Sequence, residues 1–319
     1  MKKAIIIYHS EDNDGLFSMA ISYWWLRNIQ ELSVDDINIL GTNYNQLSEL
    51  LKKGKFDNLK DKYDTLIITD VSFNEQEQML KLYKEFGDNF YWFDHHKPII
   101  DFSMKNELHN AKGLRDTNHS ALYNAWKYCF PNIKIPKYLE ILSAYDSFTF
   151  EAAGIDKEYA TAVNQGTTNA TELNPKNAIT YVRILLTDWP YKETIINDMY
   201  NRGREFIYEQ DKFNKKAILD FGDTSWTVGD RNACAMFIQA QTSSDFFKSL
   251  KGADIKNGII FKHQKNGNWG INLYNVNEDH SFHCGDYMKE HYNGGGHEGA
   301  AGCTVSEEQF IEILKNKKI

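Results

Sequence analysis

The sequence contains few cysteines and few prolines. Its 319 residues include four cysteines and five prolines, and no two cysteines form a Cys-x-x-Cys pair. This usage argues against a dense disulfide framework and indicates reduced thiols in a cytoplasmic protein. Aromatic residues make up 14% of the chain, which argues against intrinsic disorder.

Long hydrophobic runs and a net basic charge are missing as well. No stretch approaches the ~18 apolar residues of a membrane helix, and the N-terminal apolar run is shorter than the about 7–15 residues of a secretory h-region. The 36 basic and 44 acidic residues give a formal net charge of −8. We therefore expect neither a membrane nor duplex DNA as a partner, whereas a small anionic substrate is compatible with this charge.

The first half of the chain has the pattern of an α/β domain. Short apolar runs rich in β-branched and aromatic residues end in polar clusters and are separated by helix-like segments; they cover 4–8, 37–40, 65–69 and 90–93. Such runs suit strands covered on both faces, and helical crossovers predict a mainly parallel, doubly wound sheet. Ligands bind such sheets beyond the carboxyl ends of the strands, which is where the polar clusters fall.

The remainder of the chain predicts a connector helix and a second, smaller domain. Helix-like periodicity fills 118–150 and 175–216, and Pro190 is expected to begin a long helix. Beyond Gly222 short strands predominate, and Asn266-Gly267 between two β-rich runs predicts a hairpin. At roughly 100–200 residues per domain, we predict an α/β domain over 1–189, a connector helix over 190–221 and an α+β domain over 222–319.

Three of the predicted strand ends carry side chains that bind metal ions, and a further carboxylate ends an apolar helix-like segment. Taken singly, the first cluster is explained equally well as a turn that caps the next helix, and Asp146 is better explained as a helix-end cap. Their expected position at one edge of the sheet favours a metal site. The side chains of these clusters that are able to bind metal are His9, Asp12, Asp14, Asp70, Asp94, His95, His96 and Asp146.

The types of these ligands indicate which metal they would bind. Histidine and aspartate without cysteine favour a hard or borderline divalent ion, and so many carboxylates suit two ions that share a ligand. We therefore predict two divalent ions, with Mn²⁺ favoured over Mg²⁺ or Co²⁺.

The motifs resemble those of the DHH phosphoesterases, a family named for the tripeptide that stands here as Asp94-His95-His96. The first motif corresponds to His9, Asp12 and Asp14, the second to Asp70 and the fourth to Asp146, while Gly294, Gly295, Gly296 and His297 match the signature of the DHH-associated C-terminal domain. The resemblance extends from residue 9 to about residue 304 and is most similar to the nanoRNase B type of oligoribonuclease. The first motif departs from the commoner His-x-Asp-x-Asp-Gly, because Asp12 lies three positions after His9 rather than two.

The resemblance implies a catalytic first domain, a substrate-binding second domain and two metal ions bridged by Asp70. The implied ligands are His9, Asp12 and Asp70 for the first ion, and Asp14, Asp70, His95 and Asp146 for the second. A hydroxide bridging two such ions, about 3.5–4 Å apart, would attack phosphorus. The family's phosphate-contacting histidines correspond to His96 and His297, which join Asp70 as predicted catalytic residues. Asp94 is expected to orient an imidazole rather than to bind metal.

Several other residues allow competing interpretations. Gly294, Gly296 and Gly299 formally satisfy a dinucleotide-binding fingerprint, but only 20 residues follow Gly299, too few for the rest of a βαβ unit. The glycine stretch is either a tight turn or a point where the backbone approaches a phosphate.

Arg115 and His119 are candidates for phosphate contacts, although a solvated helix start explains them equally well. The cluster of His280, His283, Cys284 and His291 lacks a standard zinc spacing.

The function implied by the resemblance is a manganese-dependent phosphodiesterase or exonuclease that hydrolyses short single-stranded oligonucleotides, or nanoRNA, to nucleoside 5′-monophosphates. A short substrate is favoured because a long strand needs a basic groove with stacking aromatics. Alternative substrates are a cyclic mono- or dinucleotide, phosphoadenosine phosphate and, less favoured, polyphosphate or pyrophosphate. A catalytically silent nucleotide-binding module is the alternative from another class. The sequence leaves a homodimer open.

Overall fold

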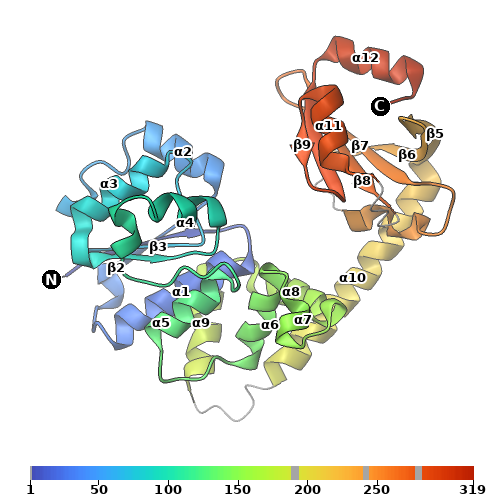
Figure 1. The fold of residues 1–319 in the computed structure, drawn as a ribbon. Coiled ribbons are helices and arrows are strands. Elements are labelled where there is room, and N and C mark those ends of the chain that lie inside the picture. The colour runs from blue at the N-terminus through green and yellow to red at the C-terminus, as the bar shows by residue number, and fades with distance from the viewer. Residues whose placement is uncertain (1, 188–193, 240–243, 277–281) are drawn as a thin grey trace. The chain divides into compact units, whose positions relative to one another are not determined.

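The computed structural model describes residues 2–187, 194–239, 244–276 and 282–319. Its contacts divide the chain into two compact units, 1–206 and 207–319. The boundary falls within the long helix α10 (Thr194–Phe221), which corresponds to the predicted connector (Figure 1). The expected start of this helix at Pro190 lies outside the described residues, and the domain limits placed at 189 and 222 remain predictions.

The first unit is built on a four-stranded parallel sheet with the strand order β2-β1-β3-β4. The strands are β1 (Ala4–His9), β2 (Ile37–Thr42), β3 (Thr65–Thr69) and β4 (Phe90–Phe93). All four expected strands are present, so the predicted α/β fold with a mainly parallel sheet is confirmed. Because the strands are parallel, their carboxyl ends meet at one edge.

Both faces of this sheet are covered by helices. Along β1, Ile6 and Tyr8 pack into one core, while Ile5 and Ile7 pack into the other. The helices around the sheet are α1 (Asn13–Asn28), α2 (Tyr44–Lys52), α3 (Gln76–Phe86) and α4 (Lys97–Ser103). Helix α1 contributes to the first core, and α2, α3 and α4 contribute to the second, on the opposite face (Figure 1). The sheet is therefore doubly wound, as its continuous apolar strands predict.

The rest of the first unit is helical and extends the first core. Its helices are α5 (Ala121–Cys129), α6 (Lys137–Asp146), α7 (Phe150–Ala153), α8 (Lys157–Thr171) and α9 (Pro175–Leu186). The expected helical stretch over 118–150 is interrupted, and Pro136 forms the N-cap of α6. Helix α8 was not predicted, because its buried face uses small residues such as Ala160 and Gly166, which give only a weak apolar signal.

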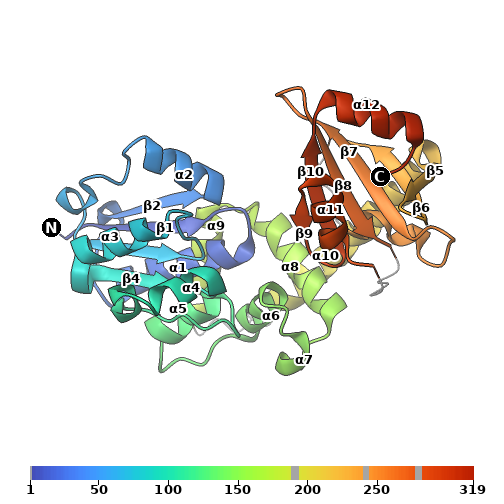
Figure 2. The same cartoon turned by 45° about the horizontal axis from the view of Figure 1, so that its top comes forward.

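The second unit contains a six-stranded mixed sheet with the order β5-β6-β7-β8-β10-β9. The strands are β5 (Asp223–Val228), β6 (Arg231–Phe237), β7 (Asn257–His263), β8 (Trp269–Asn275), β9 (Gly295–Gly296) and β10 (Ala300–Val305). Helices α11 (Cys284–Tyr292) and α12 (Glu307–Asn316) pack in one core on this sheet (Figure 2). The predicted hairpin is present: β7 and β8 are antiparallel, and Gly267 adopts a positive φ of 85° between them.

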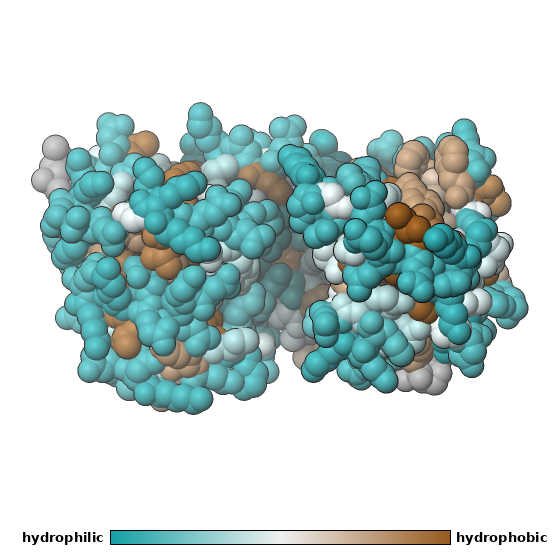
Figure 3. Space-filling view, turned by 90° about the horizontal axis from the view of Figure 1, so that it is seen from above, coloured by the Kyte–Doolittle hydropathy of each residue, from teal (hydrophilic) through white to brown (hydrophobic). Residues whose placement is uncertain are grey.

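The surface agrees with the hydrophilic composition. On the face shown in Figure 3 hydrophilic residues predominate over the first unit, and its apolar residues form small separate groups. Within the ranges that the structure describes, no helix combines the length and apolar character needed to cross a membrane.

A contact between two helix backbones yields a stability prediction. A Cβ atom added at Gly166 in α8 would lie 1.8 Å from the carbonyl oxygen of Met199 in α10. Alanine normally stabilises a helix relative to glycine by about 1 kcal/mol, but this clash outweighs that gain. We expect Gly166→Ala to destabilise the first unit by about 1–3 kcal/mol and to lower its thermal midpoint by roughly 2–4 °C per kcal/mol.

Asn169→Ala, at an exposed position of the same helix, serves as the control and should leave the midpoint almost unchanged. Equal midpoints for Gly166→Ala and the parent protein would show that the two helices do not pack this closely.

Candidate metal centre

The first motif forms a tight turn at the carboxyl end of β1. Asp12 is the N-cap of α1, and its side chain accepts a hydrogen bond from the Gly15 N–H at 2.9 Å. A Cβ atom at Gly15 would lie 2.0 Å from the His9 carbonyl oxygen, so only glycine permits this close crossing. The turn brings Asp12 beside His9, with 3.4 Å between the Asp12 carboxylate and His9 Nε2.

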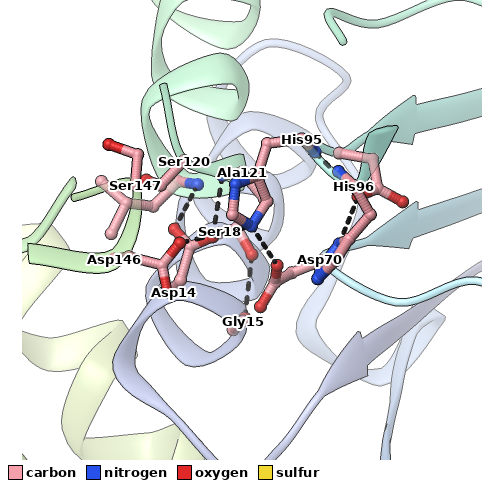
Figure 4. Close-up of polar contacts among 12 residues, drawn as sticks. Asp14, Gly15, Ser18, Asp70, His95, His96, Ser120, Ala121, Asp146 and Ser147 are labelled. Carbon is pink, nitrogen blue, oxygen red and sulfur yellow. Dashed lines mark hydrogen bonds and ion pairs between the residues drawn. The ribbon is translucent and has the colours of Figure 1, made fainter. Parts of the chain in front are cut away.

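Asp14 is buried and is held by the N-terminus of helix α5. Its two carboxylate oxygens accept hydrogen bonds from the backbone N–H groups of Ala121 and Leu122, each at 2.8 Å (Figure 4). These N–H groups have no partner within their own helix, and the positive end of the helix dipole favours an anion there. The α5 N-terminus therefore fixes the orientation of Asp14.

His95 lies among three carboxylates from different parts of the chain. Its Nε2 atom is 3.8 Å from Asp14, 3.4 Å from Asp70 and 3.3 Å from Asp146 (Figure 4). Asp70 follows β3 and is buried, and Asp146 is the last residue of α6. Asp70 has a positive φ of 56°, a left-handed conformation that is uncommon outside glycine and is tolerated best by Asn and Asp. The backbone strain at Asp70 thus occurs where its side chain enters the cluster.

Asp94 organises the segment that follows β4. Its carboxylate accepts hydrogen bonds from the backbone N–H groups of His95 and His96 at 2.7 and 3.0 Å, and from the indole of Trp92 at 3.0 Å. It also lies 2.7 Å from Nδ1 of His96. Asp94 therefore contacts His96 directly, in the geometry expected of a residue that orients an imidazole.

Burial and mutual repulsion govern the protonation of the carboxylates. Burial, followed by the charges of Asp14 and Asp12, raises the pKa of Asp146 to about 9. The pKa of Asp70 is raised well above its ordinary value for the same reasons. Asp94 behaves differently: burial alone would raise its pKa, but the hydrogen bonds from His96 and Trp92 outweigh burial and lower it. Burial alone would lower the pKa of His96, and here Asp94 reverses the direction and raises it.

The donor set fits divalent cations. Two groups of three side chains offer ligand atoms that lie within 4.8 Å of one another: Asp70, His95 and His96, and Asp14, His95 and Asp146. Two buried atoms at this site, His9 Nδ1 and Asp146 Oδ2, have no hydrogen-bond partner. Cations would satisfy such atoms and relieve the repulsion that raises the carboxylate pKa values.

The structure therefore brings Asp14, Asp70, His95 and Asp146 together as expected for one ion. His9 and Asp12 contact each other, and Asp12 is close enough to Asp70 for their charges to interact. His96 joins a potential ligand group, whereas the sequence suggested only a phosphate contact for it. Across the described ranges, no such group forms in the second unit; His283 instead caps α11, and His280 lies outside the described residues.

Arg115 has a different role from the predicted one. Its guanidinium donates hydrogen bonds to the backbone carbonyls of Ala111, His109 and Trp92 at 2.9, 3.3 and 3.3 Å, and it also lies over the Trp92 ring. A guanidinium engaged in this way braces the loop after α4, so we leave Arg115 out of the proposed phosphate contacts. His119 is hydrogen-bonded through Nδ1 to Asp116 at 2.7 Å and stacks on Tyr123.

The glycine stretch belongs to the second unit, where it forms the edge of the sheet. Gly295 and Gly296 form β9 and pair with β10, and the carbonyl of His297 accepts a hydrogen bond from the N–H of Gly285 at the start of α11. Added Cβ atoms at Gly294 and Gly296 would come within 2.5 Å of backbone oxygens, whereas nothing lies within 4 Å at Gly295. The stretch follows a helix and precedes a strand, the reverse of a dinucleotide-binding turn.

Tyr44 is a neighbour of the cluster that the sequence analysis missed. Its ring centroid lies 5.8 Å from that of His9 and 6.1 Å from that of His96. Burial, followed by the charges of Asp94 and Asp70, raises the pKa of its hydroxyl. Tyr44 begins α2 just beyond the end of β2, so the same argument from strand ends that identified the other motifs could have found it.

Three solved structures are similar to this chain, and the one with a TM-score above 0.5 supports the fold. The pGpG-specific phosphodiesterase PggH from Vibrio cholerae is 16% identical, with 99% of this chain and 97% of that one covered and a TM-score of 0.53. For exonuclease RecJ bound to manganese, the identity is 11%, the coverage 99% and 89%, and the TM-score 0.47. An exopolyphosphatase-related protein from Bacteroides fragilis is 14% identical, with 99% and 91% covered and a TM-score of 0.41. No protein-family model and no curated protein matches the sequence.

The raised carboxylate pKa values predict that the stability of the metal-free protein falls as the pH rises. Because Asp70 and Asp146 have higher pKa values in the folded than in the unfolded state, folding takes up protons, and stability falls as the pH rises from about 4 towards about 9. We expect chelator-treated protein to melt several degrees lower at pH 8 than at pH 5, and Mn²⁺ to raise the midpoint at pH 8. Thermal unfolding at the two pH values measures both effects.

A variant at Asp146 distinguishes the effect of this carboxyl on stability from a general effect of pH. The carboxyl of Asp146 must take up a proton on folding at pH 8, because its folded-state pKa is about 9, and this uptake lowers stability. Asp146→Asn removes the uptake, so at pH 8 the metal-free variant should melt above the parent and gain less from Mn²⁺. Asp35→Asn, at an exposed position, is the control. A lower midpoint for metal-free Asp146→Asn than for the parent would contradict the raised pKa of Asp146.

Proposed function

We propose that the chain is a metal-dependent phosphodiesterase of the DHH phosphoesterase type that hydrolyses short oligonucleotides to nucleoside 5′-monophosphates. The convergence of Asp14, Asp70 and Asp146 on His95 carries this proposal. Two divalent ions bound there would supply an activated water and neutralise phosphate charge. The ligands proposed for them are His9, Asp12, Asp14, Asp70, His95 and Asp146, with Mn²⁺ as the favoured metal and Asp70 as the shared ligand.

The protein's own groups provide orientation and proton donation. Asp94 fixes the His96 ring through Nδ1 and raises the pKa of His96, so protonated His96 could donate its Nε2–H to a phosphate oxygen. In the overall reaction one water is consumed: its oxygen bonds to phosphorus, the bond from phosphorus to the leaving oxygen breaks, and that oxygen gains a proton. In the second unit, His297 and the glycine stretch of Gly294, Gly295 and Gly296 are proposed to contact substrate phosphate.

Two observations favour a short substrate. The chain carries a net charge of −8, and a long single strand is usually bound by a basic groove. PggH, whose fold this chain shares, is named for the dinucleotide pGpG. A substrate of about two to five nucleotides would be held mainly by the catalytic centre, so a favourable charge over a long surface is not required.

A substrate comparison tests the activity. With Mn²⁺ we expect di- to pentaribonucleotides to be hydrolysed faster than a long single strand, a cyclic dinucleotide, phosphoadenosine phosphate or pyrophosphate, and chelator to abolish turnover. Asp70→Asn should lower kcat by more than about 100-fold, because loss of a ligand should exceed the 10–100-fold typical of outer-shell changes. Asparagine tolerates the left-handed backbone at this position, so the variant should retain its fold.

Asp101→Asn, in an exposed surface ion pair, is the matched control and should keep the parent rate. Fastest turnover of pyrophosphate or of a cyclic dinucleotide would replace the proposed substrate by that compound. Absence of turnover on every substrate, with Mn²⁺ bound and the fold intact, would identify a catalytically silent nucleotide-binding module.

The open backbone at Gly295 provides a separate test of the proposed phosphate contact. Because no atom would meet a Cβ there, Gly295→Ala should leave the thermal midpoint unchanged while it obstructs a phosphate close to the backbone. We expect KM for a diribonucleotide to rise about tenfold or more, as for the loss of one hydrogen bond to a charged group. Gly299→Ala, equally open, is the control, and equal KM values for the two variants would refute the contact.

A further inference from the structure

A pocket in the first unit lies next to the carboxylate cluster and has no role in the mechanism above. Its volume is about 440 Å³, within the 300–1,000 Å³ typical of ligand sites. The side chains that matter for the argument are His119, Tyr123, Lys137, Glu140, Ser143 and Thr149. All of them belong to residues 119–149, from just before α5 to just before α7.

The pocket and the cluster share one wall. Ser143, which lines the pocket, precedes Asp146 by three residues on α6, about 4.5 Å along the helix axis. The Ser143 hydroxyl accepts a hydrogen bond from the N–H of Ser120 at 3.3 Å, and the next N–H, that of Ala121, is bonded to Asp14. A nucleotide whose phosphate lies at the cluster could therefore extend its base into this pocket.

An ordered aromatic pair lines one side of the pocket. The His119 and Tyr123 rings stack with centroids 4.0 Å apart and an interplanar angle of 15°. Asp116 holds His119 in place through its Nδ1 atom at 2.7 Å. Rings fixed before binding lose little conformational freedom when a flat ligand packs on them, and bases stack on such side chains whatever their sequence.

The Glu140 carboxylate on helix α6 would allow the pocket to distinguish one nucleobase from another. Glu140 in α6 pairs with Lys137 at 3.4 Å in a partly exposed ion pair, which contributes little to stability and can open readily. A carboxylate only accepts hydrogen bonds and can receive two side by side. Guanine offers two adjacent N–H donors on its Watson–Crick edge, whereas adenine and uracil do not, and Lys137 could donate to the guanine O6 acceptor.

We propose that this pocket binds a base of the substrate and selects guanine through Glu140. The proposal rests on the proposed phosphodiesterase activity and adds a base preference to it. It also reassigns His119, which acts as part of a stacking surface rather than as a phosphate contact.

Competition among dinucleotides of different base composition tests the preference. With Mn²⁺ we expect kcat/KM for GpG to exceed that for ApA and UpU by about 100-fold or more, because each of two hydrogen bonds to a charged acceptor contributes roughly a factor of ten or more. Glu140→Gln should bring the three values within about threefold of one another. It should leave hydrolysis of bis(p-nitrophenyl) phosphate, which has no base, unchanged. Glu209→Gln, in a surface ion pair with the same three-residue spacing, is the matched control.

Binding of guanosine 5′-monophosphate to chelator-treated protein, measured by calorimetry beside adenosine 5′-monophosphate, distinguishes the two proposals. Guanosine-selective binding that Glu140→Gln abolishes supports the pocket even if no phosphodiester is cleaved, in which case the proposed activity alone fails. Equal kcat/KM values for the three dinucleotides in the parent, or an unchanged guanine preference in Glu140→Gln, would overturn the pocket assignment even if hydrolysis is fast.

Discussion

The mutual repulsion of buried carboxylates at one edge of the sheet is the constraint on which the site depends. Asp14, Asp70 and Asp146 come from three separate elements and approach one histidine. Burial, followed by the charges of Asp14 and Asp12, raises the pKa of Asp146 to about 9. In water these groups would separate and ionise. The fold must supply enough packing to hold them together, and only cations can make the ionised set stable at neutral pH.

The scaffold meets this constraint by holding side chains of the site through hydrogen bonds and through backbone conformation. The N-terminus of α5 holds Asp14 through two backbone N–H groups, and Asp94 holds the backbone and the ring of His96. Asp70 is kept in a left-handed conformation directly after a strand that is buried on both faces. Such groups lose little freedom when an ion binds, which is how rigid surroundings produce a preorganised metal site.

The first unit thus combines an anion-rich centre with an adjoining pocket, and both bear on the choice of substrate. Metal ions at the centre would attract phosphate, while the acidic protein as a whole disfavours long polyanions. The stacked His119–Tyr123 pair and Glu140 would then recognise the base of a small nucleotide. The second unit presents its glycine stretch as a sheet edge with open backbone at Gly295.

The sequence by itself determined the parallel sheet, its four strands and the clusters at the strand ends, because alternation, apolar runs and short motifs are local properties of the chain. Helix α8 escaped prediction, since its small buried residues carry little hydrophobic signal. Only the tertiary structure decided that Asp14 is bonded to α5, 107 residues away, that Arg115 braces a loop and that His119 lines a pocket with Glu140. These roles depend on which distant backbone groups pack beside a side chain, and no local pattern records that packing.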